Sequence, residues 1–269
     1  MQVAFIPFNT SQIHYSYGGN GNKMLLCLHG YGESEHSFHF LEQHLPEGYQ
    51  MIAIDLPYHG KTQWKEKADF TVDQLVRIID GVLAARNLPG ASFSLLGFSM
   101  GGRMSLSILQ SIPHRIHKMI LLAPDGLKVN AWYWLATQTY AGNRLFSFTM
   151  KHPGWFFGVL KLGNALKLIN PSVFKFTRHY VHDGAMRHQL YQRWSGLRKI
   201  KPNLHTIKKR IIENKIAVVL VYGEYDRIIR HERGEKFRKG IESWCSLQVL
   251  QAGHQLLQEK NAALIAGLL

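Results

Sequence analysis

The chain has 269 residues, 46% of them hydrophobic, and 32 Lys and Arg against 18 Asp and Glu give it a formal net charge of +14. This length and hydrophobic content predict one large domain, or one domain with an insertion, and exclude an intrinsically disordered protein. Two cysteines, Cys27 and Cys245, are too few for a disulfide framework, so we expect a reducing compartment and a cytoplasmic location. Residues 1–5 lack the features of a signal peptide, and no window is long enough for a membrane-spanning helix.

Eight apolar runs are predicted to be strands, and most of them alternate with helix-like segments. The predicted strands cover residues 3–7, 12–17, 24–28, 49–54, 92–96, 118–123, 216–221 and 246–250. The predicted helices cover residues 36–45, 71–87, 100–112 and 231–241, with a last helix from His254 onward, and Thr71 is a plausible cap for the second. Alternation of this kind is typical of a mostly parallel sheet covered by helices.

The alternation stops between residues 127 and 205. That segment has no strand-like run, and helices are predicted at 132–140, 155–167 and 186–197. From Gly126 to His205 there are twelve Lys and Arg but one acid, Asp183, and this stretch holds 14 of the 31 aromatic residues. We therefore expect a core of residues 1–126 and 206–269 and a basic, aromatic, helical insertion of residues 127–205.

The pentapeptide Gly97-Phe98-Ser99-Met100-Gly101 lies between a predicted strand and a predicted helix. A strand that reverses into a helix within about two residues leaves no room for side chains beside the apex, and glycine removes them. The pattern resembles the nucleophile elbow of the α/β-hydrolase family. The resemblance implies an α/β-hydrolase fold with a mostly parallel eight-stranded sheet, flanking helices and an inserted helical cap, with Ser99 as the nucleophile.

A second segment, His29-Gly30-Tyr31-Gly32, follows the predicted strand at residues 24–28. Open α/β sheets bind ligands at the carboxyl ends of their strands, and glycine lets backbone amides approach a substrate. The segment resembles the oxyanion loop of the same family. The resemblance assigns the Tyr31 and Met100 amides as the oxyanion donors, and we expect His29, Gly30 and Phe98 to line the substrate pocket.

A serine nucleophile needs a base and an orienting carboxylate. In this family the chain order is serine, then acid, then histidine. Asp226 and His254 each lie a few residues beyond the end of a predicted strand, so both could meet Ser99 at one edge of the sheet. Glu224 and Asp125 remain alternative carboxylates, although the family's G-x-x-D pattern favours Asp226.

The resemblance implies acyl chemistry: a serine hydrolase that cleaves a carboxylic ester, of carboxylesterase or lipase type, through an acyl-enzyme. A thioesterase, an acyltransferase or a carbon–carbon bond hydrolase would use the same triad, and a non-catalytic binding protein on this scaffold is a further alternative. The scheme needs no cofactor. The pairs His36-x-x-His39 and His179-x-x-His182 have helical spacing, but neither carries the glutamate of an H-E-x-x-H site, so no metal is expected.

The basic, aromatic insertion has three interpretations. It is a charged surface over an aromatic pocket, a surface for anionic lipid, or a surface for nucleic acid. No nucleic-acid recognition module is visible, so nucleic acid is not expected as a partner. The expected partners are a small acyl substrate and, through the insertion, anionic lipid; the oligomeric state is not predicted.

Overall fold

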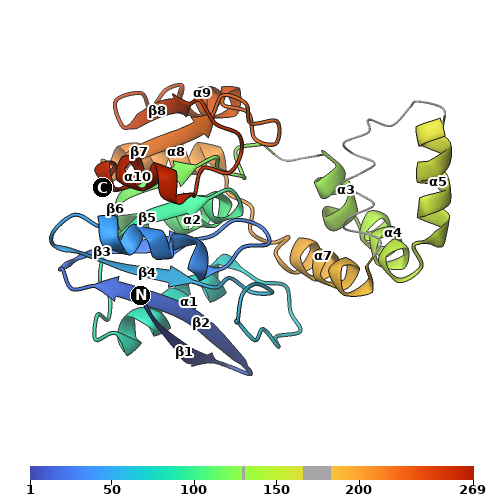
Figure 1. Cartoon of the computed structure of the whole chain (residues 1–269), viewed down its shortest axis with the longest axis horizontal. Coiled ribbons are helices and arrows are strands. Elements are labelled where there is room, and N and C mark those ends of the chain that lie inside the picture. Colours follow the sequence, from blue (N-terminus) through green and yellow to red (C-terminus); the bar gives the residue numbers. More distant parts are fainter. Residues whose placement is uncertain (129–130, 166–182) are drawn as a thin grey trace. The chain divides into compact units, whose positions relative to one another are not determined.

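The computed structural model describes residues 1–128, 131–165 and 183–269 (Figure 1). The chain divides into two compact units, which we call the core unit (Met1–Lys128 with Ile200–Leu269) and the inserted unit (Val129–Lys199). Within the described ranges, no helix combines the length and the apolar character needed to cross a membrane.

The core unit is built on one sheet. In the described residues its eight strands have the order β1-β2-β4-β3-β5-β6-β7-β8. The strands are β1 (Gln2–Phe8), β2 (Ser11–Gly19), β3 (Lys23–Leu28), β4 (Tyr49–Ile54), β5 (Phe93–Phe98), β6 (Ile116–Leu122), β7 (Ala217–Gly223) and β8 (Cys245–Leu250). The pairs β1–β2 and β2–β4 are antiparallel and the others are parallel. The predicted mostly parallel, eight-stranded sheet is thus confirmed.

Two helices of the core unit, α1 (Val72–Ala85) and α8 (Leu204–Glu213), begin at a side-chain cap. The other elements are η1 (Glu35–His44, a 3₁₀ helix), α2 (Met100–Ser111), η2 (Pro113–Arg115), α9 (Glu232–Arg238), η3 (Glu259–Asn261) and α10 (Ala262–Gly267). At the start of α1 the Thr71 hydroxyl accepts a hydrogen bond from the Gln74 amide, while the Gln74 side chain accepts one from the Thr71 amide. This capping box satisfies two amides that would otherwise lack partners and confirms the predicted cap.

The last predicted helix was wrong in its start. His254 lies in an irregular loop, and the terminal α-helix begins only at Ala262. The intervening loop buries Leu256 and Leu257 in the core. A helix that began at His254 would fix this segment in a helical backbone. The irregular loop instead lets the two leucines point inward while His254 stays at the edge of the sheet.

The inserted unit is helical in its described part. It contains α3 (Ala131–Gln138), α4 (Tyr140–Lys151), α5 (Gly154–Ala165) and α7 (Gly184–Gly196). The helix predicted at 132–140 ends earlier because Thr139 caps the next helix, accepting a hydrogen bond from the Gly142 amide. Asp183, the single acid of this stretch, caps α7 by accepting from the Met186 amide. The predicted end of the second helix at Lys167 lies outside the described residues.

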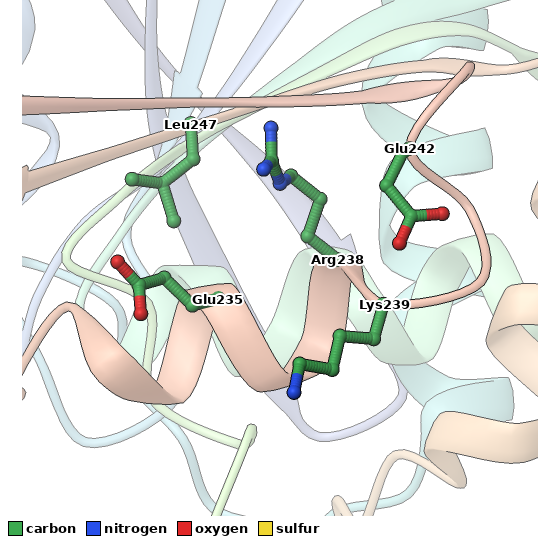
Figure 2. Close-up of a pocket in the computed structure, with 5 residues that line it drawn as sticks. All are labelled: Glu235, Arg238, Lys239, Glu242 and Leu247. Carbon is green, nitrogen blue, oxygen red and sulfur yellow. The ribbon is translucent and has the colours of Figure 1, made fainter.

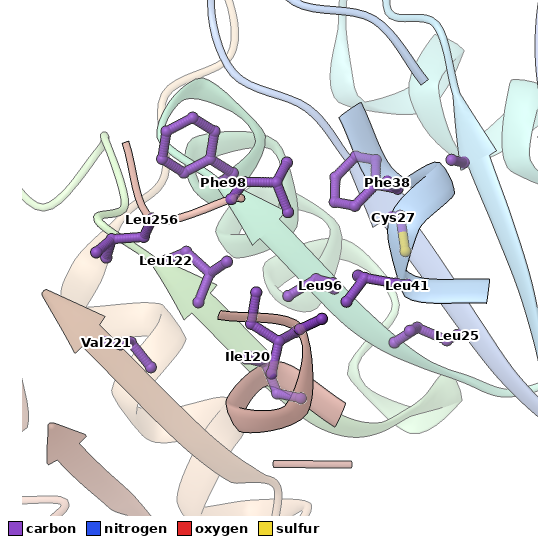
Figure 3. Close-up of a cluster of buried hydrophobic side chains, with 14 of the residues drawn as sticks. Leu25, Cys27, Phe38, Leu41, Leu96, Phe98, Ile120, Leu122, Val221 and Leu256 are labelled. Atoms are coloured by element: carbon purple, nitrogen blue, oxygen red, sulfur yellow. The ribbon is translucent and has the colours of Figure 1, made fainter. Parts of the chain in front are cut away.

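One face of the sheet carries a continuous apolar core (Figure 3). Alternate residues of the central strands point to this face, as the two-residue period of a strand requires. They are Leu25 and Cys27, Leu96 and Phe98, Ile120 and Leu122, and Val219 and Val221. Figure 3 shows Phe38 and Leu41 of η1 packed on the same side, and Ile265 of α10 belongs to the same cluster.

Both cysteines are buried and free, and burial raises the pKa of the Cys27 thiol well above its usual value.

Helix α2 approaches the sheet so closely that two of its residues have to be glycine. A Cβ on Gly101 would lie 1.8 Å from the Leu28 carbonyl oxygen, at the end of β3. A Cβ on Gly102 would lie 2.5 Å from the Pro124 side chain, beyond the end of β6. Both contacts are far inside van der Waals distance. Glycine therefore lets the start of α2 lie against the ends of the neighbouring strands.

We expect Gly101→Ala to lower the free energy of unfolding by at least about 2 kcal/mol, because the added methyl group meets rigid backbone and α2 must move. Gly267→Ala is the matched control, since no atom lies within 4 Å of its Cβ position. Urea unfolding of both variants and the wild type measures the difference. Equal stability of the two variants would contradict this account of the α2 contact.

Candidate active site

Ser99 stands at the turn between β5 and α2 in a strained backbone conformation. Its φ is 49° and its ψ is −111°, a combination that L-residues rarely adopt. Hydrogen bonds on both sides hold it there. The Ser99 amide donates to the Leu122 carbonyl (2.9 Å), and the Ser99 carbonyl accepts from the Asp125 amide (2.8 Å). Strain of this kind persists only where the surroundings fix it, and here the end of β6 does so.

The structure brings the three predicted triad residues together. The His254 Nε2 atom lies 3.1 Å from the Ser99 hydroxyl oxygen, and His254 Nδ1 lies 2.7 Å from Asp226 Oδ2. The carboxylate oxygen accepts, so Nδ1 carries the proton and Nε2 presents its lone pair to the serine hydroxyl. This is the tautomer in which a histidine can accept the serine proton.

Two loops that carry Asp226 and His254 are joined along their backbones. The Glu224 amide donates to the Leu250 carbonyl (2.8 Å), and the Tyr225 amide donates to the Ala252 carbonyl (2.9 Å). A Cβ on Gly223 would lie 2.2 Å from the Gly253 carbonyl oxygen, so the loops touch where Gly223 has no side chain. The parallel pairing of β7 and β8 thus continues beyond the strands and fixes the distance from acid to base.

The Asp226 carboxylate is buried and accepts three hydrogen bonds. Its Oδ1 accepts from the Ile228 amide (2.7 Å) and the Ile229 amide (2.9 Å), while Oδ2 accepts from His254. Burial by itself raises the pKa of Asp226, but the hydrogen bond from His254 and those from the two amides outweigh it, and the pKa lies below its ordinary value. Asp226 is therefore an anion that orients and stabilises the His254 ring.

Neither alternative carboxylate occupies this position. Glu224 is exposed. Asp125 lies 3.4 Å from Arg103 Nε and accepts a hydrogen bond from the Gly126 amide, which commits its carboxylate to the turn after β6. Asp226 is thus the candidate whose carboxylate contacts His254.

His29 was expected to line the substrate pocket; in the structure its ring connects the segment after β3 to the segment after β4. Its side chain is fully buried. Its Nε2 accepts from the Leu56 amide (3.1 Å), and its Nδ1 donates to the Gly30 carbonyl (2.8 Å). The ring therefore ties the end of β3 to the end of β4 and holds the backbone on which Gly30 and Tyr31 stand.

Phe98 and Gly30 lie next to one another and next to the base. A Cβ on Gly30 would come within 2.8 Å of the Phe98 ring, and the Phe98 and His254 ring centroids are 5.4 Å apart. Phe98 is 2% exposed. Its ring supports the imidazole from the apolar core, while Met100, the first residue of α2, presents one of the unpaired amides of a helix start beside Ser99.

Glu33 and Gln255 were not singled out from the sequence. The Glu33 carboxylate accepts from the Gly30 amide (3.2 Å) through one oxygen and from the Gln255 side chain (2.7 Å) through the other. Gln255 is the neighbour of His254, so this bridge connects the loop after β3 to the loop that carries His254. Nothing in the sequence pairs two residues so far apart, and only the position of Glu33 three residues after Gly30 places it near the site.

A separate buried cluster of His14, Glu35 and Asp55 could hold a cation, since its ligand atoms lie within 4.8 Å of one another. Both Asp55 oxygens, however, already accept from backbone amides, those of Glu35 and Lys61, at 2.7 Å each. Asp55 Oδ2 also lies 2.8 Å from His14 Nδ1. Through these contacts the cluster stabilises the turn after β4.

Two histidine pairs with helical spacing, for which no metal was expected, remain to be located in the structure. His36 and His39 lie with their Nδ1 atoms 2.9 Å apart, and His39 Nε2 lies 2.5 Å from Glu35 Oε2. The pair of His179 and His182 lies outside the described residues.

The pocket in Figure 2 is distinct from the triad. It has a volume of about 330 Å³ and lies between α9, the loop after it and β8. Its lining carries charges of both signs and one apolar side chain, from Glu235, Arg238, Lys239, Glu242 and Leu247. None of the three triad residues contributes to it, so we do not place the chemistry there.

The depressed pKa of Asp226 makes a prediction for stability. The ionised carboxylate stabilises the folded state fully above the ordinary aspartate pKa of about 3.9, and this contribution is lost as the pH falls through the lower pKa of the folded state. The difference in free energy of unfolding between the wild type and Asp226→Asn should therefore shrink between about pH 5 and pH 2. Urea unfolding over this range measures it, and a constant difference would contradict the assignment.

Comparison with known proteins finds relatives that cover most of the chain. An uncharacterised hydrolase, YugF, of Bacillus subtilis (strain 168) is 26% identical over 258 residues, which cover 92% of this chain and 89% of the relative. The human monoacylglycerol lipase ABHD6 is 22% identical over 277 residues, covering 97% of this chain and 79% of the relative.

Solved structures share the fold. A thermophilic esterase from Thermogutta terrifontis superposes with a TM-score of 0.70 at 16% identity, covering 100% of this chain and 97% of the esterase. The thioesterase domain from the curacin biosynthetic pathway gives a TM-score of 0.65 at 19% identity, covering 100% and 98%. The sequence model of the family described as "alpha/beta hydrolase fold" matches residues 23–260. The chain therefore belongs to the alpha/beta hydrolase fold family.

Proposed function

We propose that the protein is a serine hydrolase that cleaves a carboxylic ester through an acyl-enzyme, with Ser99 as nucleophile, His254 as base and Asp226 as orienting carboxylate. The observation that carries this proposal is the hydrogen-bond chain from Ser99 through His254 to Asp226, with distances of 3.1 and 2.7 Å. The strained backbone of Ser99 supports it, because such strain is common at catalytic residues.

The proposed reaction begins when the Ser99 oxygen attacks the ester carbonyl carbon and His254 Nε2 takes the hydroxyl proton. The carbonyl oxygen becomes an oxyanion, for which the Tyr31 and Met100 amides are the proposed donors. Its collapse expels the alcohol, which receives the proton from His254. A water molecule, deprotonated by the same nitrogen, then attacks the acyl carbon, and Ser99 leaves with its proton restored.

Asp226 stabilises the transient imidazolium because it stays ionised. Its hydrogen bonds from two amides and its depressed pKa keep the carboxylate anionic while His254 is charged. The proton therefore stays on the ring and is available to the leaving group. The inserted unit is proposed to act as the cap that selects the substrate.

The relatives support ester chemistry and also define the alternatives. ABHD6 is named as a monoacylglycerol lipase, and the structure from Thermogutta terrifontis is titled an esterase. The curacin structure is a thioesterase domain. A series of acyl chains of increasing length, each as an oxygen ester and as a thioester, would separate these substrate classes in one assay.

Ser99→Ala should abolish turnover of a short p-nitrophenyl ester and labelling by a fluorophosphonate probe, because both need the Ser99 oxygen. We expect a loss of at least about 10³-fold in kcat. Ser107→Ala is the matched control, since that hydroxyl donates to the Arg103 carbonyl within α2 and lies outside the proposed triad. Full turnover by folded Ser99→Ala would overturn the proposal.

The choice of acid is tested by three neutral variants. Asp226→Asn keeps the shape of the side chain, and its remaining oxygen can still accept from the Ile228 and Ile229 amides. The NH2 group then faces His254 Nδ1 and donates to it, which favours the wrong histidine tautomer, so kcat should fall by about 10³–10⁴-fold. Glu224→Gln and Asp125→Asn should stay within about threefold of the wild type, since neither carboxylate contacts His254. A larger loss of kcat in Glu224→Gln or Asp125→Asn than in Asp226→Asn would assign the role of the acid to that residue instead of Asp226.

A further inference from the structure

The inserted unit is exceptional in its charge. Ten Lys and Arg lie between Val129 and Lys199, and the single acid of this stretch, Asp183, is used as the cap of α7. Little negative charge from the same segment is therefore available to compensate these cations. A surface of this composition attracts anions that come within about one Debye length of it.

Large apolar side chains lie exposed on the same unit. A soluble surface normally carries such residues singly, whereas contiguous ones indicate an interaction site. The exposed members in the described part of the unit are Trp132, Trp134, Leu135, Tyr140, Leu145, Phe148, Trp155, Val159 and Leu162.

On α5 these side chains form one stripe. Trp155, Val159 and Leu162 have the spacing i, i+4, i+7, which places them on one face of a helix, and all three are exposed. Lys161 lies exposed beside the stripe. The exposed apolar face of this 12-residue helix, which includes a tryptophan, is one feature of a helix that lies in a membrane interface.

Helix α4 repeats this arrangement. Leu145 and Phe148 lie on one face at spacing i, i+3 and are 54% and 51% exposed. Arg144 and Lys151 flank them and are exposed as well. Two successive helices thus each present apolar side chains bordered by cations, which is the pattern that anionic lipid headgroups and acyl chains together would match.

A basic pocket opens next to the apolar face of α4. It has a volume of about 620 Å³, and its lining includes the cations of Arg144, Arg198 and Lys199 together with Tyr140, Tyr191 and Asn143. Arg144 donates to the Tyr140 hydroxyl (3.4 Å). Among the described residues no carboxylate lines the pocket, so it suits the phosphate of a lipid headgroup rather than a cation.

We infer that the exposed faces of α4 and α5, with the basic pocket beside α4, bind the surface of a bilayer that contains anionic lipids. The cations approach the headgroups, and Phe148, Trp155 and Leu162 enter the boundary of the acyl chains. This binding does not depend on the proposed hydrolysis, so the two proposals can fail separately.

The test is co-sedimentation of the full chain with vesicles of phosphatidylcholine alone or mixed with phosphatidylglycerol. It is carried out with Ser99→Ala, so that the lipid is not consumed. We expect binding to the anionic vesicles at low salt, weak binding to the neutral ones, and loss of binding as salt rises. Brominated anionic lipid should also quench the tryptophan fluorescence of the bound protein.

Matched variants locate the surface. Lys151→Glu with Lys161→Glu should lower the partition coefficient by about tenfold or more, since each basic residue near an anionic surface contributes to binding. Phe148→Ser with Val159→Ser should lower it comparably by removing apolar contacts. The controls are Lys67→Glu with Lys236→Glu, and Val3→Ser with Ile212→Ser, which change exposed side chains of the core unit by the same chemistry.

Thermal unfolding by circular dichroism checks that each variant folds. Failure of the wild-type surface to bind anionic vesicles at low salt would overturn the inference. Equal binding to neutral vesicles would also overturn it, because it would exclude recognition of charge. An equal loss of vesicle binding in the control variants would overturn it as well, because the binding surface would then lie on the core unit. If inorganic phosphate saturates the protein without weakening vesicle binding, the pocket does not belong to the lipid-binding surface.

Discussion

The candidate site depends on one steric constraint, which is the contact between the start of α2 and the end of β3. At Gly101 the helix lies against the Leu28 carbonyl so closely that a single methyl group would overlap it. This contact brings the serine turn beside the loop that begins at His29. The strained backbone of Ser99 follows from the same geometry, since the chain has to change direction between β5 and α2 without drifting away from the sheet.

Parallel pairing then supplies the other two members of the triad. Strands β6, β7 and β8 are neighbours with the same direction, so the segments after them leave the sheet at one edge. Leu122 and Asp125 hold Ser99, and the Gly223 contact joins the loops of acid and base. The distances within the triad are therefore properties of the sheet register, and the three side chains need few further supports.

Much of this could be predicted from the sequence because the relevant signals are local. The apolar runs marked all eight strands, the glycines marked the turn at Ser99, and Thr71 with Gln74 marked the start of α1. The candidate triad could be named because each member follows a strand end. What its residues do in catalysis remains a prediction, for which the hydrogen-bond chain is the structural support.

The rest was not predictable because it depends on pairs that are distant in sequence. The bridge from Glu33 to Gln255 joins two loops without a shared pattern, and the burial of His29 depends on the Leu56 amide of a neighbouring strand. The start of the last helix was misplaced at His254, because an apolar pattern such as that of Leu256 and Leu257 fits a buried loop as well as a helix. Tertiary contacts decide such cases.

The position of the inserted unit in the chain affects how the sheet is assembled. Strands β6 and β7 pair side by side, yet β6 ends at Leu122 and β7 begins at Ala217, with the inserted unit between them. Closing so long a connection costs conformational entropy, but this cost grows only with the logarithm of its length, by about 0.6 kcal/mol for each doubling. The insertion can therefore lengthen, shorten or be exchanged during evolution at a small cost to the equilibrium stability of the sheet. The larger effect is kinetic, because the β6–β7 pairing that completes the site is a long-range contact and such contacts slow folding.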